Sequence, residues 1–251
     1  MDQLDPAAAA NEIEAALRLV GTPERAVSGK RYLKSDLDFL GVTVWQIRAT
    51  VVAFASGHPS PAHDVITRVV DELWARPIHE RRMAATFVLE RYHAALGPGD
   101  LRLVERLIRE SRTWALVDGL AGDVIGRLLE RHEAAVTAVL DRWARDDDFW
   151  IRRASLLAEL RRLRRGGTLD AFAARADAML EEREFFIRKA IGWVLREAGK
   201  RNPAAVTAWL APRTHRASGV TMREAVKYLP AATGAELMAA YRERRPAAPV
   251  S

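Results

Sequence analysis

Two tryptophan-containing segments carry the residues best suited to chemistry in this sequence. Trp114 and Asp118 are four residues apart, so on a helix they share a face, one turn from each other. A carboxylate beside an indole is in a drier setting than a carboxylate on the surface. The residues alone leave an alternative, in which Trp114 belongs to the core and Asp118 caps a helix or pairs with an arginine.

The second segment places cations around an indole. Lys189, Trp193, Arg196 and Lys200 follow each other at helical spacings of four, three and four residues. One interpretation is a half-exposed core tryptophan bordered by solvated bases. The other is a surface that holds a phosphate backbone with an aromatic platform in its middle.

Several common chemistries have no matching pattern. The chain contains no cysteine, which excludes disulfides, thiol nucleophiles and thiolate metal sites. Its histidines do not follow a zinc-binding spacing, and there is no phosphate-binding loop or nucleophile elbow. The acidic run at 146–148 precedes an apolar helix start, so we interpret it as a helix cap and not as a metal cluster. We predict no metal site and no cofactor.

The positive charge is concentrated in one half of the chain. The 251 residues have a net charge of +6, and residues 142–251 contain 22 basic and 13 acidic side chains. An excess of +9 in that half favours a polyanionic partner. Alternatively, arginine is simply the solvated helix residue of this sequence. With no signal peptide and no apolar run of about 20 residues, we expect a soluble, monomeric, cytoplasmic protein associated with the nucleoid and not with membranes.

The elements that position these residues are predicted to be helices. Apolar residues recur at spacings of three and four, as in Leu101, Val104, Leu107 and Ile108, and no segment alternates for long. Short breaks with Gly or Pro fall at 21–23, 57–61, 97–100, 166–168, 202–203 and 211–212. None resembles an interdomain linker, so we predict one all-α domain over 1–251 with a frayed tail at 246–251.

An internal period of 35 or 36 residues runs through the chain. It aligns small residues in amphipathic segments, each preceded by a residue of a ladder: Arg48, Met83, Asp118, Arg153, Lys189 and Glu224. A two-helix repeat of this length predicts a HEAT-like helical solenoid of about six helix pairs. The ladder would line one surface of it, which we expect to be a concave, basic, DNA-binding surface.

The order of these segments resembles the AlkD-like DNA alkylation repair glycosylases, a family built from HEAT-like repeats. The most specific match is residues 185–197, FFIRKAIGWVLRE, and others are 31–34 with 39–41, 114–118, 148–154 and 223–225. Together they extend from about residue 30 to about 230. One segment departs from the family pattern, because residues 42–45 read VTVW where members often have a Thr-Pro helix start.

The resemblance assigns roles to single residues. It implies that Asp118 is the catalytic aspartate and that Trp114 and Trp193 are the paired tryptophans of the catalytic site. The DNA-binding residues that it implies are Tyr32, Arg153, Lys189, Arg196 and Arg48.

The reaction that the resemblance implies is hydrolysis of the N-glycosidic bond to N3- or N7-alkylated purines in duplex DNA. Such a base is cationic and leaves readily, so one carboxylate suffices to stabilise the developing oxocarbenium ion and to place water. The family leaves the lesion outside a pocket. Two alternatives from other classes are a non-catalytic binder of damaged or branched DNA and a protein-interaction scaffold.

Overall fold

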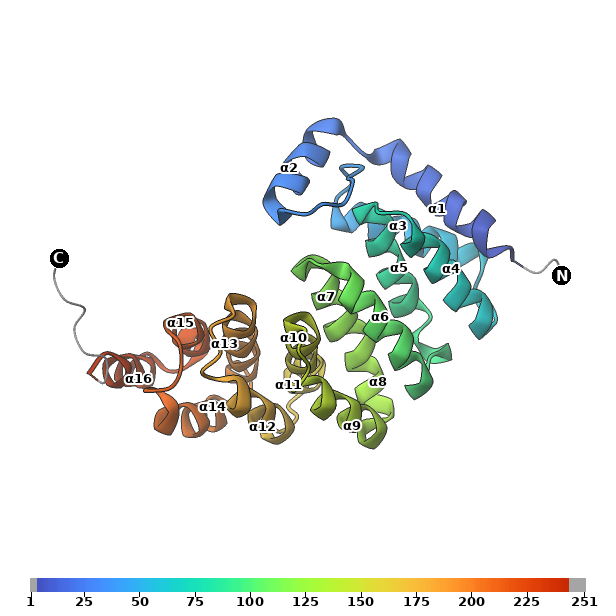
Figure 1. Cartoon of the computed structure of the whole chain (residues 1–251). Coiled ribbons are helices and arrows are strands. Elements are labelled where there is room, and N and C mark those ends of the chain that lie inside the picture. Colours follow the sequence, from blue (N-terminus) through green and yellow to red (C-terminus); the bar gives the residue numbers. More distant parts are fainter. Residues whose placement is uncertain (1–3, 244–251) are drawn as a thin grey trace. The chain divides into compact units, whose positions relative to one another are not determined.

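The computed structural model describes residues 4–243, and in this range the chain is helical with no strand (Figure 1). The all-α prediction is therefore confirmed. The described helices include none that is both long and apolar enough to cross a membrane. Two compact units, Met1–Val124 and Ile125–Ser251, divide the chain. Each unit is described by itself below. The single domain predicted over 1–251 stays a prediction. The predicted tail at 246–251 lies outside the described residues.

The first unit begins with two helices that start at prolines, and the next two helices pack on the first of them. Its helices are α1 (Pro6–Val20), α2 (Pro23–Leu33), α3 (Val44–Gly57), α4 (His63–Ala75), α5 (His79–Arg91), α6 (Leu101–Ser111) and α7 (Trp114–Gly119), with 3-10 turns at His93–Ala95 and Pro98–Asp100. A π-helical segment, Leu120–Ile125, follows α7. The core forms where α1 packs on α3 and α4 and where all three helices pack on α5.

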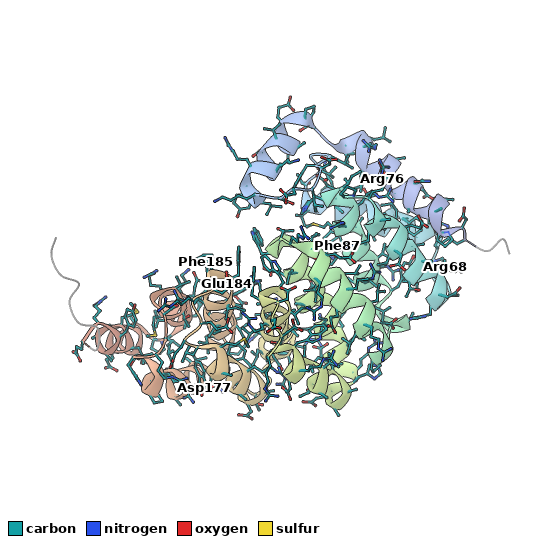
Figure 2. All side chains as sticks on the ribbon, viewed as in Figure 1. Arg68, Arg76, Phe87, Asp177, Glu184 and Phe185 are labelled. Carbon is teal, nitrogen blue, oxygen red and sulfur yellow. The ribbon has the colours of Figure 1, made fainter. Side chains whose placement is uncertain are left out.

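A buried ion cluster ties three of these helix regions together. Glu14 of α1 accepts hydrogen bonds from Arg18, from Arg76 (Figure 2) and from Arg81. Burial alone raises the pKa of Glu14, but the hydrogen bonds and charges of these arginines outweigh it and lower the pKa below its usual value. The cluster fixes α1 against the α4–α5 hairpin.

The predicted breaks coincide with helix ends, but several other breaks between helices were missed. Thr22 caps α2 by accepting from the backbone N of Arg25 at 3.4 Å, and Pro23 is its first residue. One of the missed breaks lies between α6 and α7, where Arg112 adopts the left-handed conformation with φ of 48°. No glycine or proline marks it, although it sets Trp114 at the first turn of α7.

The second unit is a succession of helices in which α13 is central. The helices are α8 (Gly126–Arg131), α9 (Glu133–Trp143), α10 (Phe149–Leu157), α11 (Leu160–Arg164), α12 (Asp170–Met179), α13 (Phe185–Gly199), α14 (Pro203–Leu210), α15 (Gly219–Ala225) and α16 (Ala231–Glu243), with 3-10 turns at Ala211–Arg213 and Val226–Tyr228. Helix α13 packs on α10 and α15. Gly192 allows its close approach to α15, since a Cβ there would lie 2.7 Å from Cβ of Glu224.

The internal period is a property of the helices within each unit. The ladder residues lie on α3, α5 and α7 of the first unit and on α10, α13 and α15 of the second. Consecutive ladder helices pack on each other within each unit. Ion pairs join side chains 35 residues apart, namely Arg106 with Asp71, Lys189 with Glu224, and Arg216 with Glu181. The concave basic surface stays a prediction.

Candidate functional site

In the first unit, the structure brings together three residues that the sequence singled out. The rings of Tyr32 on α2 and Trp114 on α7 meet edge to face, with centroids 6.0 Å apart and an interplanar angle of 84°. Asp118 lies one turn further along α7, and both it and Trp114 are half-buried. Tyr32 is 72% exposed, so the pair borders solvent. An aromatic pair and a carboxylate therefore share one region of this unit.

Arg48 lies on α3 of the same unit and is partly engaged. Its guanidinium lies 2.8 Å from a carboxylate oxygen of Glu90 and 4.2 Å from the ring centroid of Phe87. The side chain keeps 45% of its surface exposed. Arg48 can thus meet an anion from solvent while Glu90 and Phe87 hold its direction.

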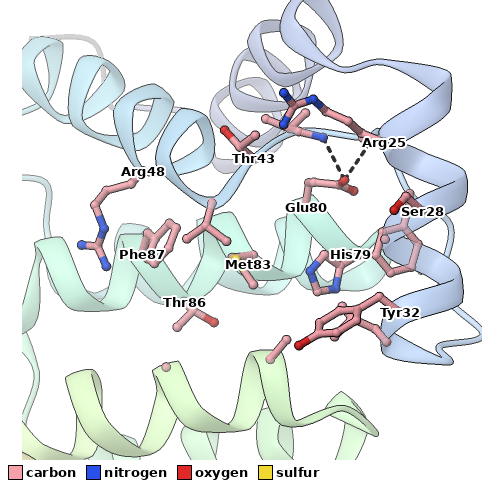
Figure 3. A pocket seen from close by; sticks show the side chains of 18 of the residues that line it. Arg25, Ser28, Tyr32, Thr43, Arg48, His79, Glu80, Met83, Thr86 and Phe87 are labelled. Carbon is pink, nitrogen blue, oxygen red and sulfur yellow. Dashed lines mark hydrogen bonds between the residues drawn. The ribbon is translucent and has the colours of Figure 1, made fainter.

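A cavity of about 540 Å³ adjoins the Tyr32–Trp114 pair and is formed by the first unit alone (Figure 3). Side chains of α2, α3, α5 and α7 and the segment 39–43 line it. Its aromatic walls include Phe39 and Phe87, and His79 contributes an imidazole. Sequence analysis missed this cavity because its walls come from segments up to about 90 residues apart, whose convergence is a tertiary property.

The segment 40–42 is a wall of the cavity and is held by one buried carboxylate. Glu80 is 1% exposed and accepts from the backbone N of Leu40, Gly41 and Val42 at 2.9, 2.8 and 3.2 Å. Figure 3 shows Glu80 beneath this segment. Gly41 has φ of 79°, and a Cβ at this residue would lie 1.9 Å from the carbonyl oxygen of Thr22. Only glycine fits here.

The segment that departs from the family pattern still starts a helix. Thr43 and Gln46 form a capping box at the first turn of α3, with Thr43 Oγ1 accepting from the backbone N of Gln46. Trp45 follows at 75% exposure. The capping box therefore replaces proline as the device that begins this helix.

In the second unit, the predicted stripe of cations lies on α13, with Lys200 just beyond its end. Lys189 Nζ and Arg196 Nη1 donate to the two carboxylate oxygens of Glu224 at 2.6 and 2.5 Å, and Lys227 Nζ donates to the first of them at 2.8 Å. Trp193 is half-buried between these two cations along the helix. The structure thus brings Lys189, Trp193 and Arg196 together, and it adds Glu224 as their common partner.

Glu224 is a strongly stabilised anion. Burial raises the pKa of this carboxyl, but hydrogen bonds from Lys189 and Lys227 and the charges of Lys189 and Arg196 lower it to about 2. A second buried carboxylate, Glu197, accepts from Lys200 at 2.9 Å and Arg164 at 3.0 Å. Sequence analysis placed Glu224 on the ladder, but nothing in its spacing identified three cationic partners.

Arg153 lies on α10 of the second unit and is 3% exposed. Its Nη1 donates to the carbonyl oxygen of Phe186 at 2.6 Å, and its guanidinium lies 5.8 Å from the ring centroid of that residue. Its role in holding a phosphate stays a prediction.

The acidic run at 146–148 serves as a helix cap, as predicted. Asp148 accepts from the backbone N of Trp150 at 2.8 Å at the start of α10. Among residues 4–243, no group of three or more His, Asp and Glu side chains is arranged to hold a metal ion.

The fold defines the class, an all-helical protein of repeated helix pairs. The residues around Trp114 and those around Glu224 are its two candidate groups of functional residues. The family model described as DNA alkylation repair enzyme matches residues 13–229. The chain therefore belongs to the DNA alkylation repair enzyme family, and the predicted family resemblance is confirmed. No curated protein sequence matches the chain at a significant level.

Solved structures are similar in fold. A predicted DNA alkylation repair enzyme from Enterococcus faecalis has a TM-score of 0.75 at 22% identity, covering 84% of this chain and 98% of its own. AlkD2 from Streptococcus mutans has a TM-score of 0.60 at 16% identity, covering 75% and 91%. The protein smu.31 from Streptococcus mutans UA159 has a TM-score of 0.59 at 14% identity, covering 85% and 100%. At these low identities, the TM-scores show a shared fold and nothing more.

Proposed function

We propose that the protein is a DNA glycosylase that hydrolyses the N-glycosidic bond of positively charged N3- and N7-alkylpurines in duplex DNA. Family membership supports action on alkylated DNA. The observation that carries the proposal is the edge-to-face pair of Tyr32 and Trp114 with Asp118 one turn along α7. An electron-rich ring and a carboxylate on one helix are what a cationic base and an oxocarbenium ion require.

The reaction needs little from the protein besides electrostatics. An alkylated purine leaves as a neutral base, so no general acid has to protonate it. The Asp118 carboxylate stabilises positive charge as it develops on the deoxyribose, and it orients the attacking water. Trp114 and Trp193 add cation–π contacts of about 0.5–2 kcal/mol each with the charged lesion. Tyr32 fixes the orientation of the Trp114 ring through their edge-to-face contact.

The remaining predicted residues serve duplex binding. Lys189, Arg196 and Lys227 surround the buried carboxylate of Glu224, and Arg196 also pairs with Glu197, so the cluster keeps a net positive charge for phosphates. Arg48 offers a part-exposed guanidinium in the first unit, and Arg153 is the further proposed phosphate contact. These contacts position the duplex without reading its sequence. We propose that the protein acts as a monomer at the nucleoid.

Replacement of Asp118 by Asn tests the catalytic role. We expect the wild-type protein to release 7-methylguanine from methylated duplex DNA, and the Asp118→Asn variant to bind the duplex but to lose most of the excision rate. Asp71→Asn is the matched control, because Asp71 is a part-exposed aspartate of α4 that pairs with Arg106. Undiminished excision by Asp118→Asn would refute the proposed role.

The same assays separate the alternatives. A wild-type protein that binds duplex DNA in a salt-sensitive manner and releases no base is a non-catalytic DNA binder. A protein without duplex affinity in filter binding at both low and moderate salt is an interaction scaffold.

A further inference from the structure

His79 is a buried titratable side chain that the proposed reaction does not use. It is 6% exposed and stacks on Phe39, with ring centroids 4.6 Å apart and an interplanar angle of 12°. Its Nδ1 is buried without a hydrogen-bond partner, and no hydrogen bond joins Nε2 to any described residue. Because His79 lines the cavity of the first unit, Nε2 is the ring atom left for a molecule inside it.

The protonation state of His79 follows from its surroundings. Burial lowers the pKa of this imidazole, and the charge of Glu80 opposes that effect only in part. The ring is therefore neutral near pH 7 and carries one proton. A buried N–H without an acceptor is rarer in proteins than an unpaired acceptor, so the proton belongs on Nε2. His79 thus presents a hydrogen-bond donor to the cavity.

The other walls favour a flat, aromatic occupant. Tyr32, Phe39, Phe87 and Trp114 contribute rings, and Met83 contributes a thioether that adapts to aromatic surfaces. The volume of about 540 Å³ falls within the range of small-molecule sites, about 300–1,000 Å³. The Glu80 carboxylate also lines the cavity, but three backbone N–H groups already occupy its oxygens.

Cations at the edges favour an anionic group on that occupant. Arg25 on α2 is exposed and has no ion pair with any residue in 4–243. Arg48 lies at another edge of the cavity (Figure 3), and 45% of its side chain is exposed. A guanidinium binds phosphate oxygens through paired N–H groups.

We propose that this cavity binds one purine nucleotide. The purine ring lies between the aromatic walls, an acceptor atom of the ring takes the Nε2–H of His79, and the phosphate lies on Arg25. The nucleotide is either free or a unit displaced from a DNA strand, and both present the same chemistry. The site shares Tyr32, Trp114 and Arg48 with the proposed glycosylase site, but Asp118 does not line it, so nucleotide binding can be tested without the glycosylase reaction.

Isothermal titration of the full chain with GMP tests the site. We expect one GMP per chain, with CMP and ribose 5-phosphate binding at least tenfold more weakly. The His79→Phe variant keeps the stack on Phe39 and removes the donor, and loss of one hydrogen bond should weaken GMP about tenfold. Arg25→Gln should weaken GMP but not guanosine, and Arg31→Gln, an exposed arginine of α2 outside the cavity lining, should weaken neither.

A second variant guards against a misfolded His79→Phe protein. Ser28 is an exposed residue of α2 at the cavity, so Ser28→Trp should fill the opening without touching the core and should abolish GMP binding. The proposal is overturned if GMP gives no heat at millimolar concentration, if CMP and ribose 5-phosphate bind equally well, or if both variants keep wild-type affinity.

A duplex containing 2-aminopurine separates the two sources of the nucleotide. If the occupant comes from DNA, the fluorescence change on binding should be reversed by GMP and absent with Ser28→Trp. If the occupant is a free nucleotide, neither added GMP nor the Ser28→Trp substitution should change duplex binding. Failure of the nucleotide proposal is distinguishable from failure of the proposed function. The Asp118→Asn variant should keep GMP binding while it loses excision. Loss of GMP binding in Ser28→Trp is measured separately from 7-methylguanine release.

Discussion

Replacing Glu224 by Gln should destabilise the second unit by an amount that depends on pH. Glu224 is 6% exposed and accepts hydrogen bonds from Lys189, Arg196 and Lys227. Glutamine keeps the size of the side chain but loses the charge, so it resembles the protonated acid. The variant therefore measures how much the ionised carboxylate contributes to the free energy of unfolding.

The magnitude follows from the pKa of Glu224. A carboxyl group whose pKa falls from 4.5 in the unfolded chain to about 2 in the folded one contributes about 3 kcal/mol at pH 7. Because the folded pKa is the lower one, this contribution is present above about pH 4.5 and is lost as the pH falls towards 2. At pH 3 about 1 kcal/mol should remain.

Urea unfolding followed by circular dichroism at pH 7 and pH 3 provides the measurement. The difference in unfolding free energy between wild type and Glu224→Gln should shrink by about 2 kcal/mol between these two pH values. Glu236→Gln on α16 is the control, because Glu236 is exposed, and it should change stability by less than about 0.5 kcal/mol. A loss for Glu224→Gln that is equal at both pH values, or below about 1 kcal/mol at pH 7, would refute the electrostatic reasoning.

Three further substitutions test one cation of the Glu224 cluster and two glycines at close contacts. Lys189→Gln should lower the slope of log affinity against log salt for duplex DNA by about one, while Arg68→Gln on α4, labelled in Figure 2, should not. Gly41→Ala should destabilise by about 1–3 kcal/mol in thermal unfolding because φ is 79° and the Cβ would meet Thr22; Gly57→Ala, with open space around its Cβ, should be near neutral. Gly192→Ala should cost about 1–3 kcal/mol by forcing α13 from α15, and a Gly192→Ala variant of wild-type stability would contradict the close approach.

The sequence predicted where the helices lie better than it predicted which of their side chains meet in space. Six breaks marked by glycine or proline were found because these residues act locally, as at Pro23, but the break between α4 and α5 was missed although it contains Pro77. The break at Arg112 was missed, since a left-handed arginine leaves no compositional mark. The pairing of Trp114 with Asp118 on one helix face could be predicted from spacing alone, whereas its contact with Tyr32 spans 82 residues and is set by packing.

The distribution of charge along the sequence also did not reveal which cations are paired in the folded protein. The excess of +9 in residues 142–251 predicted a basic surface, but many of these cations are engaged within the unit. Arg175 reaches the fully buried Glu159, and Arg213 and Arg216 share Asp177 (Figure 2). The hydrogen bond from Arg213 is the largest cause of a lowered pKa at Asp177, and the charges of Arg213 and Arg216 add to it, although burial acts in the opposite direction.

Such pairing changes what the basic excess can do. A cation held by a buried carboxylate loses side-chain freedom before any ligand arrives, so binding a phosphate costs less conformational entropy. The carboxylate also cancels part of the charge, which limits non-specific attraction. In the Glu224 cluster both effects apply to Lys189 and Arg196. Glu224→Gln should therefore steepen the salt dependence of duplex binding, because it adds one net positive charge, while it reduces discrimination between methylated and unmodified duplexes by releasing both side chains from their fixed directions.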